Sequence, residues 1–294
     1  MSGRLSALAI TSCLTASCIA NQPPVMPPQS TQWVSQCQDW DEWNKAGPPY
    51  KIHGNSYYVG TCGISAILIA GDNGHILIDT GTEKGAEMVK ANIKKLGFNP
   101  EDISILLSSH EHFDHVGGFA KMKSWTGADI VTSTAAAGVL TSGKDSEDDP
   151  QFAMHPPMAA VAVSRTVKNG DIVRLGNIKL TTMETPGHTP GALSWSWESC
   201  AGKDCLNIVY ADSLSPVSSD SFRFSDHANY LASYREAIKR IAASKCDILL
   251  TPHPSASDMH KRLKAGTMRD SSACISYAQA ISKRLDERLA KETQ

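Results

Sequence analysis

Short apolar runs rich in β-branched residues alternate with longer amphipathic stretches along most of the chain. Short apolar runs that end at turn residues are typical of buried strands, whereas apolar positions three and four apart are typical of helices. In the first half, within a β-rich region that starts near residue 50, this pattern predicts strands at 57–59, 64–69, 75–79 and 103–107. It predicts helices at 83–96, from about 120, and, after a further short strand, within 126–140.

The second half of the chain repeats this plan from about residue 171. The strands predicted there are 172–175, 178–183, 193–198, 206–210 and 247–251. Helices are predicted at about 228–243 and from 271 onward. Two β-rich halves, each flanked by helices, predict one α/β domain, and a chain of 294 residues with 41% hydrophobic content can bury a large core.

The segment Ser109-His110-Glu111-His112-Phe113-Asp114-His115 directly follows the predicted strand 103–107 and precedes a helix. Open α/β sheets usually bind ligands at the carboxyl ends of their strands. In an extended loop, residues two apart point the same way, so His110 and His112 can bind one metal ion together. Asp114 and His115 would then turn toward a second metal ion. The segment therefore predicts a two-metal site.

Two later histidines lie in the same kind of place. His188 follows the predicted strand 178–183 within Thr-Pro-Gly-His-Thr-Pro-Gly, and His253 lies between two prolines after the predicted strand 247–251. Proline restricts the backbone, which suits a residue that must keep one orientation. A solvated polar loop would explain one such segment, but three of the same design favour metal binding. Six ligands form two sets of three, and a metal ion with three protein ligands keeps an open position for catalysis.

The order His-x-His-x-Asp-His, then Pro-Gly-His, then a final histidine at a strand end resembles the metallo-β-lactamase superfamily from about Tyr50 to the C-terminus. Within it, the chain is most similar to subclass B3. The resemblance implies a four-layer αββα sandwich with a dizinc site in the cleft at the sheet edge. It implies that the first zinc ion is held by His110, His112 and His188. It implies that the second zinc ion is held by Asp114, His115 and His253.

The resemblance also implies an activity, the hydrolysis of the β-lactam amide of penicillins, cephalosporins and carbapenems, and with it β-lactam resistance. Two zinc ions can share a water molecule and lower its pKa from about 16 to near neutrality, and Asp114 would orient the resulting hydroxide and transfer its proton. The donor set suits zinc, although iron also uses such sites. A formal net charge of −2 indicates neither a nucleic acid nor an anionic membrane as partner. The expected partner is a small molecule, and the expected state is a monomer.

The segment Tyr210-Ala211-Asp212-Ser213-Leu214-Ser215 separates relatives within the superfamily. In its thioester and phosphodiester hydrolases an aspartate in this region bridges both metals, and in subclass B1 a cysteine binds the second zinc. By resemblance to subclass B3, Ser213 and Ser215 would hold the substrate carboxylate here. A plain turn residue is the alternative for Ser213. A bridging Asp212 would instead favour a thioesterase or a lactonase.

Several other residues have two interpretations. Asp79, at the end of the predicted strand 75–79, would either orient a ligand histidine or cap the helix 83–96. Gln151 and Phe152 could touch substrate from the polar segment 143–157, or this segment is a plain surface loop. Three aromatic residues in and next to the N-terminal arm would either overhang the cleft or anchor the arm: Trp40, Trp43 and Tyr50. Five histidines have no partner motif and are expected to pack or to lie on the surface: His53, His75, His155, His227 and His260.

Residues 1–20 are predicted to be a signal peptide for export to the periplasm, because Arg4 precedes a mostly apolar stretch and small residues. Cleavage after Ala20 would release a soluble protein. The segment Leu14–Cys18 instead resembles a lipoprotein box, which would leave a lipid anchor on Cys18. Residues 21–49 are interpreted as an N-terminal arm with a flexible leader at 22–32, and residues 50–294 as the catalytic domain.

Six cysteines lie beyond the predicted signal peptide, at positions 37, 62, 200, 205, 246 and 274. An even number in an exported chain indicates disulfide bonds, although six cysteines allow fifteen pairings. Cys200 and Cys205 bracket a short turn and form the simplest pair. The resemblance to subclass B3 implies the pair Cys246–Cys274, which leaves Cys37–Cys62.

Overall fold

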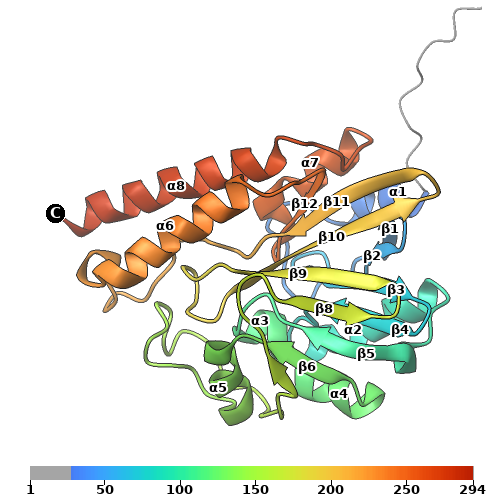
Figure 1. The fold of residues 1–294 in the computed structure, drawn as a ribbon, viewed down its shortest axis with the longest axis horizontal. Coiled ribbons are helices and arrows are strands. Elements are labelled where there is room, and N and C mark those ends of the chain that lie inside the picture. The colour runs from blue at the N-terminus through green and yellow to red at the C-terminus, as the bar shows by residue number, and fades with distance from the viewer. Residues whose placement is uncertain (1–27, 294) are drawn as a thin grey trace, which may run out of the picture.

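A computed structural model describes residues 28–293, and it places two β-sheets face to face with helices on both outer sides (Figure 1). The first sheet has seven strands in chain order: β1 (Tyr50–His53), β2 (Ser56–Tyr58), β3 (Ile67–Gly71), β4 (Gly74–Ile78), β5 (Ile103–Leu107), β6 (Asp129–Thr132) and β7 (Arg165–Thr166). The second sheet has the spatial order β12 (Ile248–Leu250), β11 (Asp204–Tyr210), β10 (Leu193–Ala201), β9 (Ile178–Glu184) and β8 (Ile172–Leu175).

The outer face of the first sheet is covered by α2 (Glu83–Lys95), α4 (Phe119–Thr126) and α5 (Thr134–Ser142). The outer face of the second sheet is covered by α6 (Ala228–Ala242) and α8 (Ala273–Glu292). The shorter helices are α1 (Pro28–Gln36), α3 (Phe113–Val116) and α7 (Met259–Lys264), with 3-10 turns η1 (Pro100–Asp102), η2 (Phe224–Asp226) and η3 (Pro254–Ser257). This arrangement is the predicted αββα sandwich.

Alternation along β3 shows how the sequence produces these layers. Successive side chains of a strand point to opposite faces of the sheet. Ile67 and Ile69 therefore pack into the core between the two sheets, while Leu68 between them packs against the outer helices. All three are fully buried, so this strand shows a continuous apolar run rather than an alternating one.

Strand direction brings the polar loops to one edge. Strands β4, β5 and β6 are parallel, so their carboxyl ends meet at the same rim of the first sheet. In the second sheet, β11 and β12 are also parallel, and the Leu193 amide at the start of β10 donates to the Ser109 carbonyl just after β5 at 2.6 Å. A backbone hydrogen bond therefore connects the two sheets at the edge where the histidine loops lie.

Some expectations about the elements were wrong. Residues 28–32, expected within a flexible leader, belong to helix α1, whose Trp33 is buried against Tyr50 and Tyr58. The strand expected at 64–69 begins at Ile67, because residues 59–66 form a tight loop. Helix α7 was not predicted.

The structure contains the three predicted disulfide bonds: Cys37–Cys62, Cys200–Cys205 and Cys246–Cys274. The first ties the arm to the loop before β3, and the third ties the segment before β12 to the start of α8. The predicted signal peptide and Cys18 lie outside the described residues. Within 28–293, no helix is both long and apolar enough to cross a membrane.

Candidate metal site

The first group of ligands comes from two loops at the sheet edge. His110 and His112 lie between β5 and α3, and His188 lies in the turn between β9 and β10. One ring nitrogen of each lies within 4.8 Å of the corresponding nitrogen of the other two. The ring centroids are 4.8–5.0 Å apart, and all three side chains are buried. The structure thus brings together the three residues expected for the first metal ion.

The second group surrounds the carboxylate of Asp114, in the first turn of α3. Its Oδ2 lies 3.1 Å from His115 Nε2 and 3.4 Å from His253 Nε2, and His253 comes from the loop after β12. Donor atoms of His110, Asp114 and His115 also lie within 4.8 Å of one another, so the two groups adjoin at His110. His253 is held in place by its loop, whose Pro252 carbonyl accepts a hydrogen bond from the Ser65 amide at 2.8 Å.

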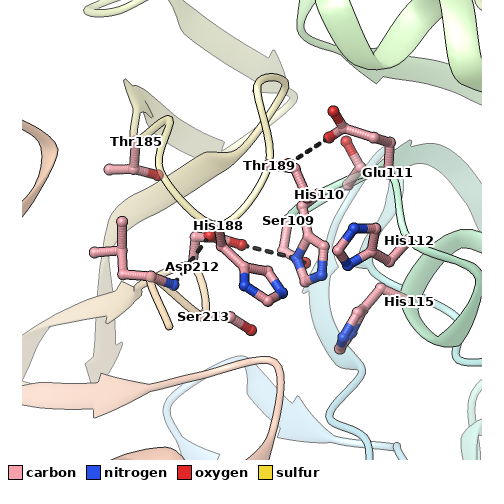
Figure 2. A network of polar contacts seen from close by, with 12 residues as sticks. Ser109, His110, Glu111, His112, His115, Thr185, His188, Thr189, Asp212 and Ser213 are labelled. Carbon is pink, nitrogen blue, oxygen red and sulfur yellow. Dashed lines mark hydrogen bonds and ion pairs between the residues drawn. The ribbon is translucent and has the colours of Figure 1, made fainter. Parts of the chain in front are cut away.

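Each ligand ring of the first group is oriented by a contact to the nitrogen that would face away from a metal ion. His110 Nδ1 lies 2.8 Å from Asp212 Oδ1 (Figure 2), and His112 Nε2 lies 2.9 Å from Asp149 Oδ2. His188 Nδ1 lies 2.9 Å from the Ser215 carbonyl oxygen. Such contacts to the outer nitrogen are typical of metal-binding histidines, because they fix the tautomer and the direction of the ring.

Several donor atoms at the centre of the cluster are buried and form no hydrogen bond with the described residues. These atoms are His110 Nε2 and both ring nitrogens of His115, although His115 Nε2 lies 3.1 Å from the Asp114 carboxylate. A buried polar atom that lacks a hydrogen bond costs free energy, so such an atom in a native site calls for a bound ion or water. Imidazole nitrogens with one carboxylate are donors that zinc and neighbouring transition metals prefer. The residues therefore fit a metal centre.

The protonation states of four of the six candidate ligands suit metal binding, while, against the effect of burial, neighbouring carboxylates raise the pKa of His112 and His115. Burial lowers the pKa of His110 and His188 far below the usual value, and burial lowers the pKa of His253 to about 4, so these rings are neutral donors. Burial by itself would raise the pKa of Asp114, but the imidazole of His115, with those of His253 and His112, outweighs it and holds that pKa well below its usual range. Asp114 is therefore ionised, as a metal ligand must be.

Asp79 supports the second group from behind. Its Oδ1 accepts from the Ser109 amide and its Oδ2 from the Tyr210 hydroxyl, both at 2.7 Å, and Oδ2 lies 3.8 Å from His115 Nδ1. Thr82, not Asp79, caps helix α2, since the Thr82 hydroxyl accepts from the Gly85 amide at 3.0 Å. Asp79 therefore faces His115, as the interpretation of a residue that orients a ligand histidine expects, and the helix-cap interpretation was wrong.

Glu111, inside the histidine motif, connects two of the ligand loops. Its side chain is 2% exposed, and it accepts from Thr189 Oγ1 at 2.7 Å (Figure 2) and from the Gly191 amide at 2.8 Å. Both donors belong to the turn that carries His188. Position 191 must be glycine, because a Cβ there would lie 2.6 Å from a Glu111 carboxylate oxygen and from the Ala136 amide nitrogen. Glu111 therefore fixes the His188 loop to the His110–His112 loop.

A cavity of about 190 Å³ opens above the ligands. Its walls include Trp40 and Trp43 from the arm, so these residues do overhang the cleft, whereas Tyr50 is buried in the core as part of β1. His155 also lines it, with its ring centroid 4.4 Å from that of His112. The expectation that His155 has no place at the site was therefore wrong.

The other four histidines without a motif pack away from the cluster. His53 contacts the Asp204 carbonyl, His75 packs on Phe98, His227 stacks on Phe222 and His260 packs near Trp33.

Known proteins resemble this chain over nearly its whole length. Residues 59–200 match the family model of the metallo-beta-lactamase superfamily. The solved structure of the MIM-2 metallo-beta-lactamase is 52% identical, with a TM-score of 0.87, covering 90% of this chain and 98% of that one. MEM-A1, a subclass B3 metallo-beta-lactamase from a soil metagenome library, is 41% identical, with a TM-score of 0.83 and coverage of 86% and 99%. The chain belongs to subclass B3 of the metallo-β-lactamases.

Two further similarities bear on the site. SMB-1, solved in a complex with mercaptoacetic acid, is 41% identical, with a TM-score of 0.83 and coverage of 86% of this chain and 100% of that one. A hydroxyacylglutathione hydrolase of Rhodospirillum rubrum is 32% identical over 126 residues, which is 43% of this chain and 40% of that protein. The chain thus matches less than half the length of this curated relative. Members of the superfamily are metal-dependent, in agreement with the His and Asp clusters.

The residues expected around a substrate in this B3 family member lie on the wall of the same cavity. Ser213, Ser215 and Gln151 all line it. Ser215 also serves His188, because its hydroxyl lies 3.0 Å from His188 Nδ1, and the Gln151 amide nitrogen lies 3.3 Å from His188 Nε2. Phe152 is 43% exposed and does not line this cavity.

Asp212 belongs to neither group of candidate ligands. Its Oδ1 is used by His110 Nδ1, and its Oδ2 accepts from the Leu214 amide at 3.2 Å. Burial raises the pKa of Asp212 to about 8 and lowers that of His110, so burial by itself favours the neutral form of both. A cation bound at His110 Nε2 would favour the ionised carboxylate and strengthen this contact.

Proposed function

We propose that this protein is an exported dizinc β-lactamase that hydrolyses the amide bond of penicillins, cephalosporins and carbapenems and so confers resistance to them. The observation that carries the proposal is the pair of three-residue groups at the sheet edge, in a chain that shares 52% sequence identity with a metallo-beta-lactamase of the same fold. Each group has three donors, which leaves a metal ion an open position for substrate or water.

The ligand sets follow from the two groups. His110, His112 and His188 would hold the first zinc ion, and Asp114, His115 and His253 would hold the second. When bound, the metal pair supplies Lewis acidity that polarises the amide carbonyl and lowers the pKa of a water molecule.

Asp114 is the residue of this chain that would handle protons. Its pKa is held well below the usual range, so it is ionised at neutral pH. Oδ2 faces His115 and His253, while Oδ1 has no hydrogen-bond partner among the described residues. Oδ1 would orient the attacking water, accept its proton and pass this proton to the departing lactam nitrogen.

Substrate binding would use the cavity wall. Ser213, with Ser215 and Gln151, would donate hydrogen bonds to the carboxylate that β-lactam antibiotics carry. Trp40 and Trp43 would cover the cleft and restrict access of bulk water.

The remaining parts of the proposal concern the whole protein. Residues 1–20 would direct export to the periplasm, where the targets of β-lactams lie, and lipidation at Cys18 is the alternative to a soluble form. We propose that the protein is a monomer, that residues 21–49 form an arm and that residues 50–294 form the catalytic domain.

The direct test is hydrolysis of a carbapenem and a penicillin by the purified protein, before and after chelation and after zinc is restored. We expect hydrolysis that is lost with the chelator and returns with zinc, at a stoichiometry of two zinc ions per chain. Fully zinc-loaded protein that hydrolyses neither drug would refute the proposal.

A second candidate, a thioesterase or lactonase, is favoured by the partial match to hydroxyacylglutathione hydrolases. It would require Asp212 to bridge two metals, whereas the Asp212 carboxylate is engaged by His110 and the Leu214 amide. A glutathione thioester and an acyl lactone in the same assay distinguish the two candidates. Hydrolysis of these substrates without hydrolysis of either drug would favour the second.

A further inference from the structure

The cavity above the metal ligands has a single lysine or arginine among its described lining residues, Arg284 on helix α8. We propose that Arg284 is a specificity-determining residue that binds the carboxylate of an anionic substrate together with Ser213. The inference rests on the proposed function, since it concerns how that same site selects its substrate.

Ser213 points to a missing hydrogen-bond partner. Its side chain is 5% exposed and lines the cavity, and its hydroxyl has no hydrogen-bond partner among the described residues. A buried hydroxyl without a partner is costly, so a ligand atom that reaches it gains more than a surface contact would. The hydroxyl is both donor and acceptor, and a carboxylate oxygen satisfies its donor role.

The turn that carries Ser213 is held by two tyrosines. The Tyr277 hydroxyl donates to the Asp212 carbonyl at 2.8 Å and also contacts the Ser213 carbonyl, and the Tyr234 hydroxyl contacts the Leu214 carbonyl. Ser213 therefore lies on a rigid turn, which lowers the ordering cost of a bound ligand.

Arg284 lies two helical turns after Tyr277, on the same face of α8, and so faces the same turn. Burial raises the pKa of both Tyr234 and Tyr277, and the positive charge of Arg284 acts on both hydroxyls in the opposite direction. The side chain is exposed, and within residues 28–293 it makes no ion pair. Its charged neighbours on α8 are paired elsewhere: Lys283 with Glu287, Asp286 with Arg235, and Arg288 with Glu292.

A guanidinium without an ion pair and a hydroxyl without a hydrogen bond, on the wall of one cavity, are suited to a small anion. Arginine binds a carboxylate in a planar, two-bond arrangement that a neutral group cannot reproduce. A charge-assisted contact at a partly exposed site predicts an affinity difference of about tenfold between carboxylate and neutral ligands, which falls as salt screens the charge.

The test uses the full chain loaded with cobalt, in which binding of a thiolate to the metal gives an absorption band without any turnover. The probes are mercaptoacetate, which carries a carboxylate, and 2-mercaptoethanol, which does not. We expect Arg284→Ala to weaken mercaptoacetate about tenfold and to leave 2-mercaptoethanol unchanged. Lys283→Ala removes an exposed cation from the adjacent position and should change neither affinity. 2-Mercaptoethanesulfonate shows whether the site accepts other anions. If Arg284→Ala weakens its binding as much as that of mercaptoacetate, the inference extends to small anions generally.

Equal weakening of both thiols by Arg284→Ala, or no effect on either, would overturn the inference. Steady-state kinetics supply a second readout: for a β-lactam, Arg284→Ala should raise KM about tenfold with little change in kcat, while its methyl ester should show no such difference. If the wild-type protein hydrolyses β-lactams and the Arg284→Ala variant has the same KM, the role of Arg284 is refuted while the proposed function stands. If the wild-type protein hydrolyses no β-lactam but Arg284→Ala still weakens mercaptoacetate selectively, the proposed function is refuted while the role of Arg284 stands.

Discussion

Replacing Glu111 with alanine should damage the metal site, although Glu111 is not among the candidate ligands. The carboxylate accepts two hydrogen bonds from the turn that carries His188, and the first of its partners, Thr189 Oγ1, can find another orientation. The Gly191 amide cannot rotate away, so Glu111→Ala leaves a buried donor unsatisfied as well as a small cavity.

The size of the effect follows from those contacts. A lost hydrogen bond to a charged acceptor costs about 1.5–3 kcal/mol. The alanine variant also avoids the free-energy penalty of burying a carboxylate, which offsets part of this loss. We expect a net loss of about 2–4 kcal/mol of folding free energy, or a fall in Tm of roughly 5–15 °C for a chain of this size. Because the His188 loop loses its anchor, zinc affinity should fall about 10–100-fold.

Glu111→Gln is the matched control. Its amide oxygen can still accept from Gly191, and its NH₂ group can donate to Thr189 if that hydroxyl rotates, so the geometry is kept without the charge. The measurements are Tm by calorimetry and zinc affinity by competition with a chelator. A Glu111→Ala protein with wild-type Tm and zinc affinity would refute this reasoning. Glutamine that is as damaging as alanine would show that charge, and not the two hydrogen bonds, is what matters.

Three further predictions follow from other parts of the fold. Removing metal with a chelator should lower Tm, by the equivalent of about 2.7 kcal/mol where zinc was at a hundred times its Kd, and an unchanged Tm in calorimetry would contradict metal-linked stability. Replacing Cys246 and Cys274 by serine should cost about 3.5 kcal/mol in urea unfolding, because their separation of 28 residues sets the loop entropy; a loss below about 1 kcal/mol would contradict this. Hydrogen bonds from Asn207 hold the pKa of Asp247 below its usual value, so its stabilising contribution is present above the unfolded pKa of about 4 and is lost as the pH falls through the folded value. Asp247→Asn should therefore lower Tm by more at pH 7 than at pH 3, and an equal difference at both pH values would contradict this.

Most elements of the fold could be predicted from the sequence, because the signals are local. The run at β5 is short, apolar and followed by polar residues, and the same is true of β12 before His253. Such runs must be buried wherever the chain folds, so the polar residues that follow them are expected at the ends of the strands, on the rim of a sheet. The three histidine loops were predictable for the same reason.

Where the predictions failed, long-range contacts were decisive. Composition indicates a flexible leader at residues 22–32, but Trp33 is buried against Tyr50 and Tyr58 and orders the helix around it. The strand expected from residue 64 begins three residues later because Asn92, on another element, donates to the carbonyls of Gly47, Val59 and Gly60 and holds the preceding loop. Neither contact has a signal in the local sequence.

The sequence by itself predicted the strands, the helices and the six candidate ligands, since apolar period and histidine spacing are encoded by neighbouring residues, and the motif order indicated the family and, through it, the sandwich. The tertiary structure alone decided which residues support them. Asp149 and Asp212 reach the outer nitrogens of His112 and His110 from segments 37 and 102 residues away in the chain (149 − 112 and 212 − 110). Arg284 reaches the cleft from the last helix for the same physical reason: packing of the layers, and not order along the chain, determines which polar groups share one cavity.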